Sequence, residues 1–257
     1  MPTVICIANQ KGGVGKTTTA INLAAALAAA ERPTLLIDLD PQGNATSGVG
    51  VDKAELSLSV YDLLLNGAVA DAAIVDTGHP YLHLLPSSRD LSGAEIELAS
   101  QQARESRLKQ GLASILDRYT YILIDCPPSL SLLTINAMAA ADSVLIPLQC
   151  EFYAMEGLSQ ILHTIRLIQK GINSALRIEG IVLTMADHRN RLSRDVEHEV
   201  RTHFPHETMK TVIPRNVRLS EAPSHGKPIL YYDITSRGAA AYLELAGELL
   251  ERGAEHA

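Results

Sequence analysis

The sequence NQKGGVGKTT fills residues 9–18, directly after an apolar run over residues 3–8. Its three glycines allow the backbone to curl so that successive N–H groups point at phosphate oxygens. In such a loop Lys16 reaches the β- and γ-phosphates, and the hydroxyl of Thr17 ligates Mg²⁺. The alanine-rich residues 16–30 predict a helix after the loop. This order of strand, loop and helix predicts a site for the phosphates of a nucleoside triphosphate.

Lys11 is one lysine more than a phosphate-binding loop requires. It is either a solvated surface charge or a cation at the mouth of the loop, from which it reaches a phosphate of its own subunit or of a neighbour. Thr18 falls in the first helical turn, near the α-phosphate and the positive end of the helix dipole. The nucleotide-binding residues expected here are Lys11, Gly12, Gly13, Val14, Gly15, Lys16, Thr17 and Thr18.

Length and composition are those of a globular α/β protein. The chain has 257 residues, of which 46 % are hydrophobic, which is enough for one large domain with a filled core. No apolar run approaches the roughly 20 residues of a membrane span, and no signal peptide is expected at the start of the chain. Cys6, Cys126 and Cys150 are too few and too apolar in setting for a disulfide framework. We therefore expect reduced cysteines in a cytoplasmic protein.

Apolar, β-branched runs alternate with helical patterns along the chain. The runs are almost continuously apolar, as in parallel strands covered by helices on both faces. This alternation predicts an α/β fold of the P-loop NTPase class, with a doubly wound, mostly parallel sheet in a single domain over residues 1–257. Ligands are then expected at the carboxyl ends of the strands. The expected strands are 3–8, 34–39, 82–86, 121–125, 143–148, 178–184 and 211–213, and the expected helices are 16–30, 92–117, 129–140, 154–170, 191–203 and 236–251.

Two carboxylates stand at the end of the second expected strand, in LLIDLDPQGN over residues 35–44. Asp38 and Asp40 are two residues apart, so on extended backbone they face the same side. Beside a phosphate loop, one carboxylate can orient the attacking water and the other can hold water around Mg²⁺. For Asp38 the alternative is a capping role in the turn that residues 41–43 would form. For Asp40 we favour chemistry, because a charge on an apolar strand is costly without a purpose.

A second apolar strand ends in an acidic residue, in ILIDCPPS over residues 122–129. This is the form of a Walker B segment, in which Asp125 reaches Mg²⁺ through water. The prolines at 127 and 128 end the strand, and Ser129 can cap the following helix. Cys126 is interpreted as a packing residue.

Charge is segregated toward the C-terminal third, although the chain as a whole has a net charge of −7. Residues 187–237 contain nine Arg or Lys and seven Asp or Glu, a balance of +2, which leaves −9 for the rest. Within this region VIPRNVRLSEAPS, residues 212–224, predicts a strand tip, a proline turn and a short helix with two arginines. It is either a solvated basic turn or a surface for phosphate contacts.

In combination these segments resemble the ParA/MinD family of deviant Walker A ATPases, and its ParA/Soj branch, from residue 4 to about residue 250. The resemblance implies that Lys11 is the signature lysine, which crosses a dimer interface to the ATP of the partner. It implies that Asp40 acts on the hydrolytic water and that the segment around Asp125 is a γ-phosphate-sensing switch. The implied catalytic residues are Lys11, Lys16 and Asp40.

The resemblance also implies the remaining ligand contacts. Pro214 and Asn216 would lie against the adenine, and QCEFYAMEG over residues 149–157 would make dimer contacts unless it is only a connection between a strand and a helix. The implied Mg²⁺ residues are Thr17, Asp38 and Asp125. The implied DNA contacts are Arg189, Arg215, Arg218, Lys227 and Arg237, some of which we expect to pair with nearby glutamates.

The function implied by this resemblance is ATP-driven DNA segregation. ATP and Mg²⁺ would close two subunits into a homodimer that binds double-stranded DNA without sequence preference. A ParB-type centromere-binding protein would stimulate hydrolysis and release the dimer. The protein would be cytoplasmic and nucleoid-associated, with no membrane partner.

Three alternatives share parts of this pattern. A MinD-like membrane-cycling ATPase should end in a basic amphipathic helix, but residues 244–255 are acidic. A reductase like the nitrogenase iron protein needs cluster-bridging cysteines, and Cys126 and Cys150 do not fit that pattern. A nucleotide-switched scaffold with negligible turnover is disfavoured by Asp40. No helix-turn-helix segment precedes the first expected strand, which disfavours the larger plasmid type that represses its own operon and leaves both chromosome and plasmid open as cargo.

Overall fold

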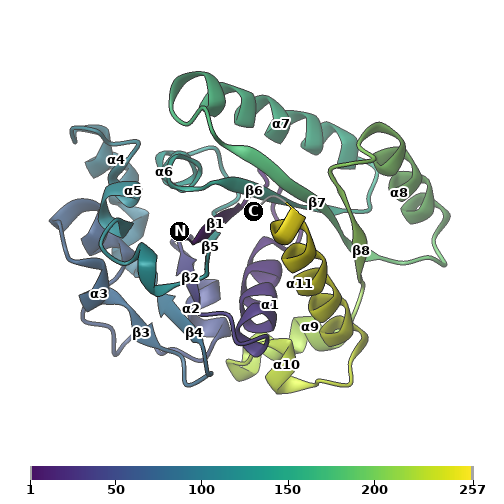
Figure 1. Cartoon of the computed structure of the whole chain (residues 1–257), viewed down its shortest axis with the longest axis horizontal. Helices are drawn as coiled ribbons and strands as arrows, with labels where there is room; N and C mark the ends of the chain where they lie inside the picture. Colours follow the sequence, from purple (N-terminus) through teal and green to yellow (C-terminus); the bar gives the residue numbers. More distant parts are fainter. Residues whose placement is uncertain (1, 256–257) are drawn as a thin grey trace.

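One eight-stranded sheet runs through the computed structural model, which describes residues 2–255 (Figure 1). The strand order is β3-β4-β2-β5-β1-β6-β7-β8, and every neighbouring pair is parallel except β3 with β4. The strands are β1 (Thr3–Ile7), β2 (Thr34–Asp38), β3 (Val75–Asp76), β4 (Leu82–Leu85), β5 (Tyr121–Asp125), β6 (Ser143–Gln149), β7 (Arg177–Ala186) and β8 (Thr208–Pro214).

Helices connect the strands and cover both faces of the sheet. They are α1 (Lys16–Ala29), α2 (Asn44–Gly48), α3 (Ala70–Ala73), α4 (Ala94–Ala99), α5 (Arg107–Leu112), α6 (Leu132–Ala140), α7 (Ala154–Gly171), α8 (Arg191–His203), α9 (Val217–Glu221), α10 (Ile229–Tyr232) and α11 (Arg237–Glu255). Short helical turns occur at Asp62–Asn66, Arg89–Ser92, Leu116–Arg118 and Ala222–His225. Among residues 2–255, no helix is both long and apolar enough to span a membrane.

The strands bury side chains on both faces, which explains their continuous apolar character. Along β1, Ile5 and Ile7 pack in the cluster with α1 and α11, whereas Val4 and Cys6 pack in the opposite cluster with α4 to α8. Figure 1 shows α1 and α11 side by side on one side of the sheet and α6, α7 and α8 on the other. The predicted doubly wound α/β fold is therefore confirmed.

The predicted acidic residues meet at one edge of the sheet. β5 lies between β1 and β2, with Asp125 in register with Ile7 on one side and with Asp38 on the other. Because the strands are parallel, their carboxyl ends also share this edge with the loop that follows β1. The topology thus brings the three acidic and glycine-rich segments together.

The single helix predicted over residues 92–117 is wrong. The chain forms α4 and α5 with an irregular stretch between them. Asn136 of α6 compensates for the break, because its Nδ2 donates to the carbonyl of Arg104 (2.7 Å) and its Oδ1 accepts from the N–H of Leu108 (3.1 Å). A side chain from another helix thus replaces hydrogen bonds that a continuous helix would have made.

Other differences concern the ends of elements. The helix predicted from residue 129 begins at Leu132, with Ser131 rather than Ser129 at its N-cap position. The last strand is longer than predicted, and β3 pairs over only two residues, too few for a pattern of alternation to reveal it.

Candidate functional site

The glycine-rich loop between β1 and α1 has the backbone that its sequence predicts. Gly13 and Gly15 have φ values of 76° and 87°, in the left-handed region that favours glycine. Two contacts that sequence reasoning missed anchor this loop to neighbouring strands. Thr184 Oγ1 donates to the carbonyl of Val14 (2.9 Å), and Asn9 Nδ2 donates to the carbonyl of Pro147 (2.8 Å). The loop is therefore held by the carboxyl ends of β6 and β7.

Lys16 begins α1 and is buried at the base of the loop. Its ammonium donates to the carbonyl of Lys11, at 2.9 Å. Burial lowers the pKa of Lys16, and the nearby carboxylate of Asp125 opposes this shift. A cation desolvated in this way gains most from a strong anionic partner such as a phosphate.

Asp125 is the most unusual group of the site. It is fully buried, and neither of its carboxylate oxygens accepts a hydrogen bond of ordinary geometry from the described residues, although the nearby hydroxyl of Thr17 interacts with it. Burial raises the pKa of Asp125 well above its ordinary value, the carboxylate of Asp38 raises it further, and the hydroxyl of Thr17 opposes this shift. Buried polar atoms are normally satisfied, so orphaned oxygens mark the place of a missing partner. Together with the hydroxyl of Thr17, this oxygen-rich setting fits a Mg²⁺ ion.

Asp38 is fully buried but well satisfied. Its Oδ2 accepts from the N–H and the hydroxyl of Thr46, both at 2.7 Å, and its Oδ1 accepts from the N–H of Asp40 at 3.2 Å. Burial raises the pKa of Asp38 to about 6, and the hydrogen bonds from Thr46 work against that shift. In this structure Asp38 holds the turn that carries Asp40. Its predicted contact with Mg²⁺ stays a prediction.

Asp40 borders the cavity beside the phosphate-binding loop. Its Oδ1 accepts from the N–H of Gln42 (2.9 Å), and its carbonyl accepts from the hydroxyl of Ser87 (2.7 Å). These bonds fix the backbone on both sides of the carboxylate. The cavity is lined by Gly12, Gly13, Gly15, Lys16, Thr17, Thr18, Asp40, Gln42, Asn44, Pro128 and Met185.

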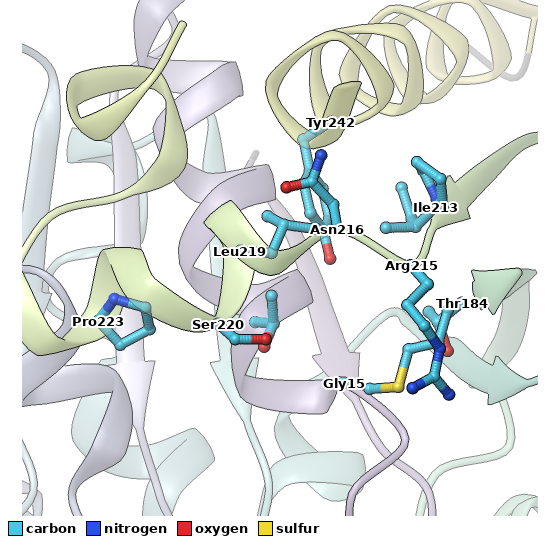
Figure 2. Close-up of a pocket in the computed structure, with 12 residues that line it drawn as sticks. Gly15, Thr184, Ile213, Arg215, Asn216, Leu219, Ser220, Pro223 and Tyr242 are labelled. Atoms are coloured by element: carbon cyan, nitrogen blue, oxygen red, sulfur yellow. The ribbon is translucent and has the colours of Figure 1, made fainter. Parts of the chain in front are cut away.

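A second cavity adjoins the first, because Gly15, Thr18 and Met185 line both. Figure 2 shows this pocket between β7, β8 and α11. The predicted residues Pro214 and Asn216 line it. Its other lining residues are Thr184, Ile213, Arg215, Leu219, Ser220, Pro223 and Tyr242. Its mixed polar and apolar wall suits a base and ribose.

Asn216 and Tyr242 are each held in place. Asn216 is the N-cap of α9, where its Oδ1 accepts from the N–H of Arg218 at 2.8 Å. The hydroxyl of Tyr242 lies 3.1 Å from that of Thr19 on α1. Tyr242 comes from α11, more than 200 residues after the loop in the sequence, and no local pattern marks it. Only the packing of α11 against α1 reveals its place in the pocket.

Lys11 lies at the mouth of the loop, as predicted, but its side chain contacts its own subunit. Its Nζ is 3.1 Å from the carboxylate of Glu151, in the segment between β6 and α7. Both side chains are partly exposed. Its role toward a partner subunit stays a prediction.

The five predicted DNA contacts are all exposed, but two of them carry carboxylate partners. Arg189 forms a two-pronged pair with Asp187, which holds the pKa of that carboxyl down at about 2. Arg218 contacts Glu221 at 2.8 Å and Asp233 at 3.4 Å. Arg215 also lines the second cavity, so it is not simply a surface residue. The remaining two, Lys227 and Arg237, are exposed on the segments that flank α10.

Comparison with known proteins gives consistent matches over the chain. The family model AAA_31, an AAA domain, matches residues 2–178. The chromosome partitioning protein ParA of Myxococcus xanthus is 56 % identical over 249 residues, which cover 97 % of this chain and 88 % of that protein. The sporulation initiation inhibitor protein Soj of Bacillus subtilis is 56 % identical over 253 residues, which cover 98 % and 100 %.

A solved structure extends the likeness to three dimensions. Cobyrinic acid a,c-diamide synthase from Mycobacterium smegmatis, with bound ADP and magnesium, superposes with a TM-score of 0.87 at 39 % identity. The match covers 100 % of this chain and 97 % of that one. The curated relatives match almost the whole chain, including the phosphate-binding loop, the strands that end in acidic residues and the residues of the second cavity. The chain therefore belongs to the ParA/Soj family of chromosome-partitioning ATPases.

Proposed function

We propose that this ATPase segregates DNA. ATP closes two subunits into a dimer, the dimer binds double-stranded DNA without sequence preference, and hydrolysis stimulated by a ParB-type partner releases it. The observation that carries the proposal is the grouping of Lys16, Thr17 and Asp40 around one cavity, while Lys11 is not among the residues that line it and pairs with Glu151 instead. A cation outside its own phosphate cavity is suited to act on a second subunit.

Residues at the two cavities and beside them have separate roles in binding and hydrolysing ATP. The loop N–H groups and Lys16 bind the phosphates, and Thr18 lies beside them at the helix N-terminus. Thr17 and Asp125 would hold Mg²⁺, which neutralises charge on the phosphate oxygens when bound. Asp40, fixed by its turn, orients the attacking water and accepts its proton. Pro214 and Asn216 hold the adenine in the second cavity.

Dimerisation makes a modest basic surface effective. Arginine and lysine contacts to phosphates give affinity without sequence preference. A single subunit offers few uncompensated cations, because Arg189 and Arg218 already contact carboxylates. Two subunits on one duplex add their contacts and raise the effective affinity. Nucleoid association follows from this DNA binding.

Membrane cycling is the alternative with the same nucleotide site. It needs an amphipathic helix whose apolar face is free to enter lipid. In α11 the apolar residues Leu245, Ala246 and Leu249 are buried in the core that also contains α1. This packing favours DNA over a membrane as the surface on which the protein acts.

Co-sedimentation separates the two functions. The full chain is sedimented with plasmid DNA, and separately with vesicles of anionic lipid, each with and without ATP and Mg²⁺. We expect ATP-dependent sedimentation with DNA and none with vesicles. ATP-dependent recovery with vesicles instead of DNA would overturn the proposal.

A further inference from the structure

Lys11 and Glu151 form the ion pair at the mouth of the nucleotide site. Lys11 Nζ lies 3.1 Å from Glu151 Oε2, and the two residues are 140 positions apart in the sequence. The side chains are 34 % and 47 % exposed, so solvent screens their attraction. The pair joins the phosphate-binding loop to the segment that follows β6. It also gives the side chain of Lys11 a partner within its own subunit.

The backbone of Lys11 is tied to the lysine that binds phosphate. The carbonyl of Lys11 accepts from Lys16 Nζ at 2.9 Å, and its N–H donates to Asn9 Oδ1 at 3.0 Å. A phosphate in the cavity competes for the ammonium of Lys16, because a charged acceptor makes the stronger hydrogen bond. Nucleotide binding therefore removes one of the contacts that hold Lys11 in its present conformation.

Glu151 is itself held in a defined turn. Its Oε1 accepts from the side-chain amide of Gln149, and its carbonyl accepts from the N–H of Ala154 at the start of α7. The next two residues, Phe152 and Tyr153, are 74 % and 62 % exposed and contact each other edge to face. A fixed carboxylate thus stands beside an exposed aromatic pair at the mouth of the site.

We propose that Glu151 is a positioning residue that keeps Lys11 within its own subunit until nucleotide binds. While the pair is closed, the ammonium of Lys11 is not available to a second subunit. The pair opposes dimer closure, and nucleotide weakens it through Lys16. The consequence for dimerisation rests on the proposed function, whereas the opening of the pair is a property of one subunit.

The size of the effect follows from the exposure of the pair. An exposed ion pair changes an equilibrium by up to about fivefold. Closing a dimer opens two such pairs, so losing both restraints favours dimerisation by up to about 25-fold.

The pair is tested in the single subunit with a zero-length carbodiimide, which joins a lysine to a carboxylate in contact. Nucleotide-free protein should give a cross-link between Lys11 and Glu151, detected by mass spectrometry. Mixing isotope-labelled with unlabelled protein separates links within one chain from links between chains. A non-hydrolysable ATP analogue with Mg²⁺ should reduce the within-chain link several-fold. If the cross-link is absent without nucleotide, or if nucleotide does not change its yield, the proposed role of Glu151 is wrong.

Dimerisation tests the consequence. With the ATP analogue, Glu151→Gln should form dimers at a concentration up to about 25-fold lower than the parent chain does. The control is Glu251→Gln, which removes an exposed carboxylate on α11, outside residues 149–157, for which dimer contacts are implied. In a Lys11→Ala background the Glu151→Gln change should have no further effect.

The outcomes distinguish the proposed role of the Lys11–Glu151 pair from the proposed function of the dimer. Weaker dimerisation of Glu151→Gln would mean that Glu151 supports the interface, and the proposal would be wrong. If the parent chain never dimerises with nucleotide, the proposed dimer fails. The within-chain cross-link then still decides whether nucleotide opens the pair.

Discussion

Asp40 is the carboxylate that the cavity exposes beside the phosphate-binding loop. Its backbone carbonyl accepts from the hydroxyl of Ser87 and from the N–H of Gly43, so replacing the side chain removes only the bond from the N–H of Gln42 and should leave the turn in place. We expect Asp40→Ala to keep its affinity for ATP and to hydrolyse it at least about 100-fold more slowly, the usual contribution of a general base. Phosphate release and equilibrium nucleotide binding measure the two quantities. Turnover at the normal rate would remove Asp40 from the reaction.

Replacing Asp125 should have opposite effects on the stability of the nucleotide-free protein and on its stabilisation by ATP and Mg²⁺. Its buried oxygens accept no hydrogen bond of ordinary geometry among the described residues, and burial outweighs the nearby hydroxyl of Thr17, so the nucleotide-free protein bears the cost of a buried carboxylate. Asp125→Asn removes the charge with little change of shape. Without nucleotide it should raise Tm by about 2–4 °C for each kcal/mol gained. With ATP and Mg²⁺ the variant should be stabilised less than the parent chain, because a Mg²⁺ contact is lost. A lower Tm without nucleotide would contradict this view of the site.

The sequence predicts those residues whose chemistry is local. Gly13 and Gly15 follow from the backbone that a phosphate loop needs, and Asp125 follows from an apolar strand that ends in an acid. Thr184 and Tyr242 could not be predicted in the same way. They reach the site through strand order and helix packing, which no short segment encodes.

At the scale of elements, Glu248 attaches α11 to the edge of the sheet. Its carboxylate accepts from the N–H groups of Lys210 and Thr211 at 2.8 and 2.9 Å and pairs with Arg252. Burial raises the pKa of Glu248, but these hydrogen bonds and Arg252 outweigh it and lower the pKa overall. Glu248→Gln should therefore reduce the free energy of unfolding by about 1 kcal/mol near pH 7. The exposed Glu251→Gln serves as the control.

The pH dependence of this loss has a defined sign. The folded pKa of Glu248 lies below the unfolded value of about 4.3. The carboxylate therefore contributes fully above the unfolded pKa, and its contribution is lost as the pH falls through the folded pKa. Denaturant titrations should give a difference between parent and Glu248→Gln that shrinks below about pH 4. A difference that grows on acidification would contradict this assignment.

Elements were predictable where periodicity and burial agree. α7 and α8 have apolar faces that sit on the sheet, and both appear close to the predicted residues. The helix predicted over 92–117 failed because its break depends on Asn136, far along the chain. Helical spacing in the sequence records which face is apolar, but not a distant amide that makes the interruption favourable.

DNA binding belongs to the scale of the whole molecule. Arg218 is exposed, although it contacts Glu221 and Asp233. Arg218→Ala should weaken DNA binding with ATP present and leave nucleotide affinity unchanged. If each subunit loses one phosphate contact, the slope of log affinity against log salt should fall by about 1.8. Lys109→Ala, on α5, is the control. An unchanged slope and affinity would exclude Arg218 from the surface.

The dimer is the central claim of this account, and Lys11 tests it most directly. Molar mass is measured by light scattering for the parent chain and for Lys11→Ala, each with and without a non-hydrolysable ATP analogue and Mg²⁺. With nucleotide, the parent chain should reach twice its mass of 27.7 kDa, and Lys11→Ala should remain at the mass of one chain. A Lys11→Ala variant that doubles its mass with nucleotide as readily as the parent would contradict the cross-subunit role.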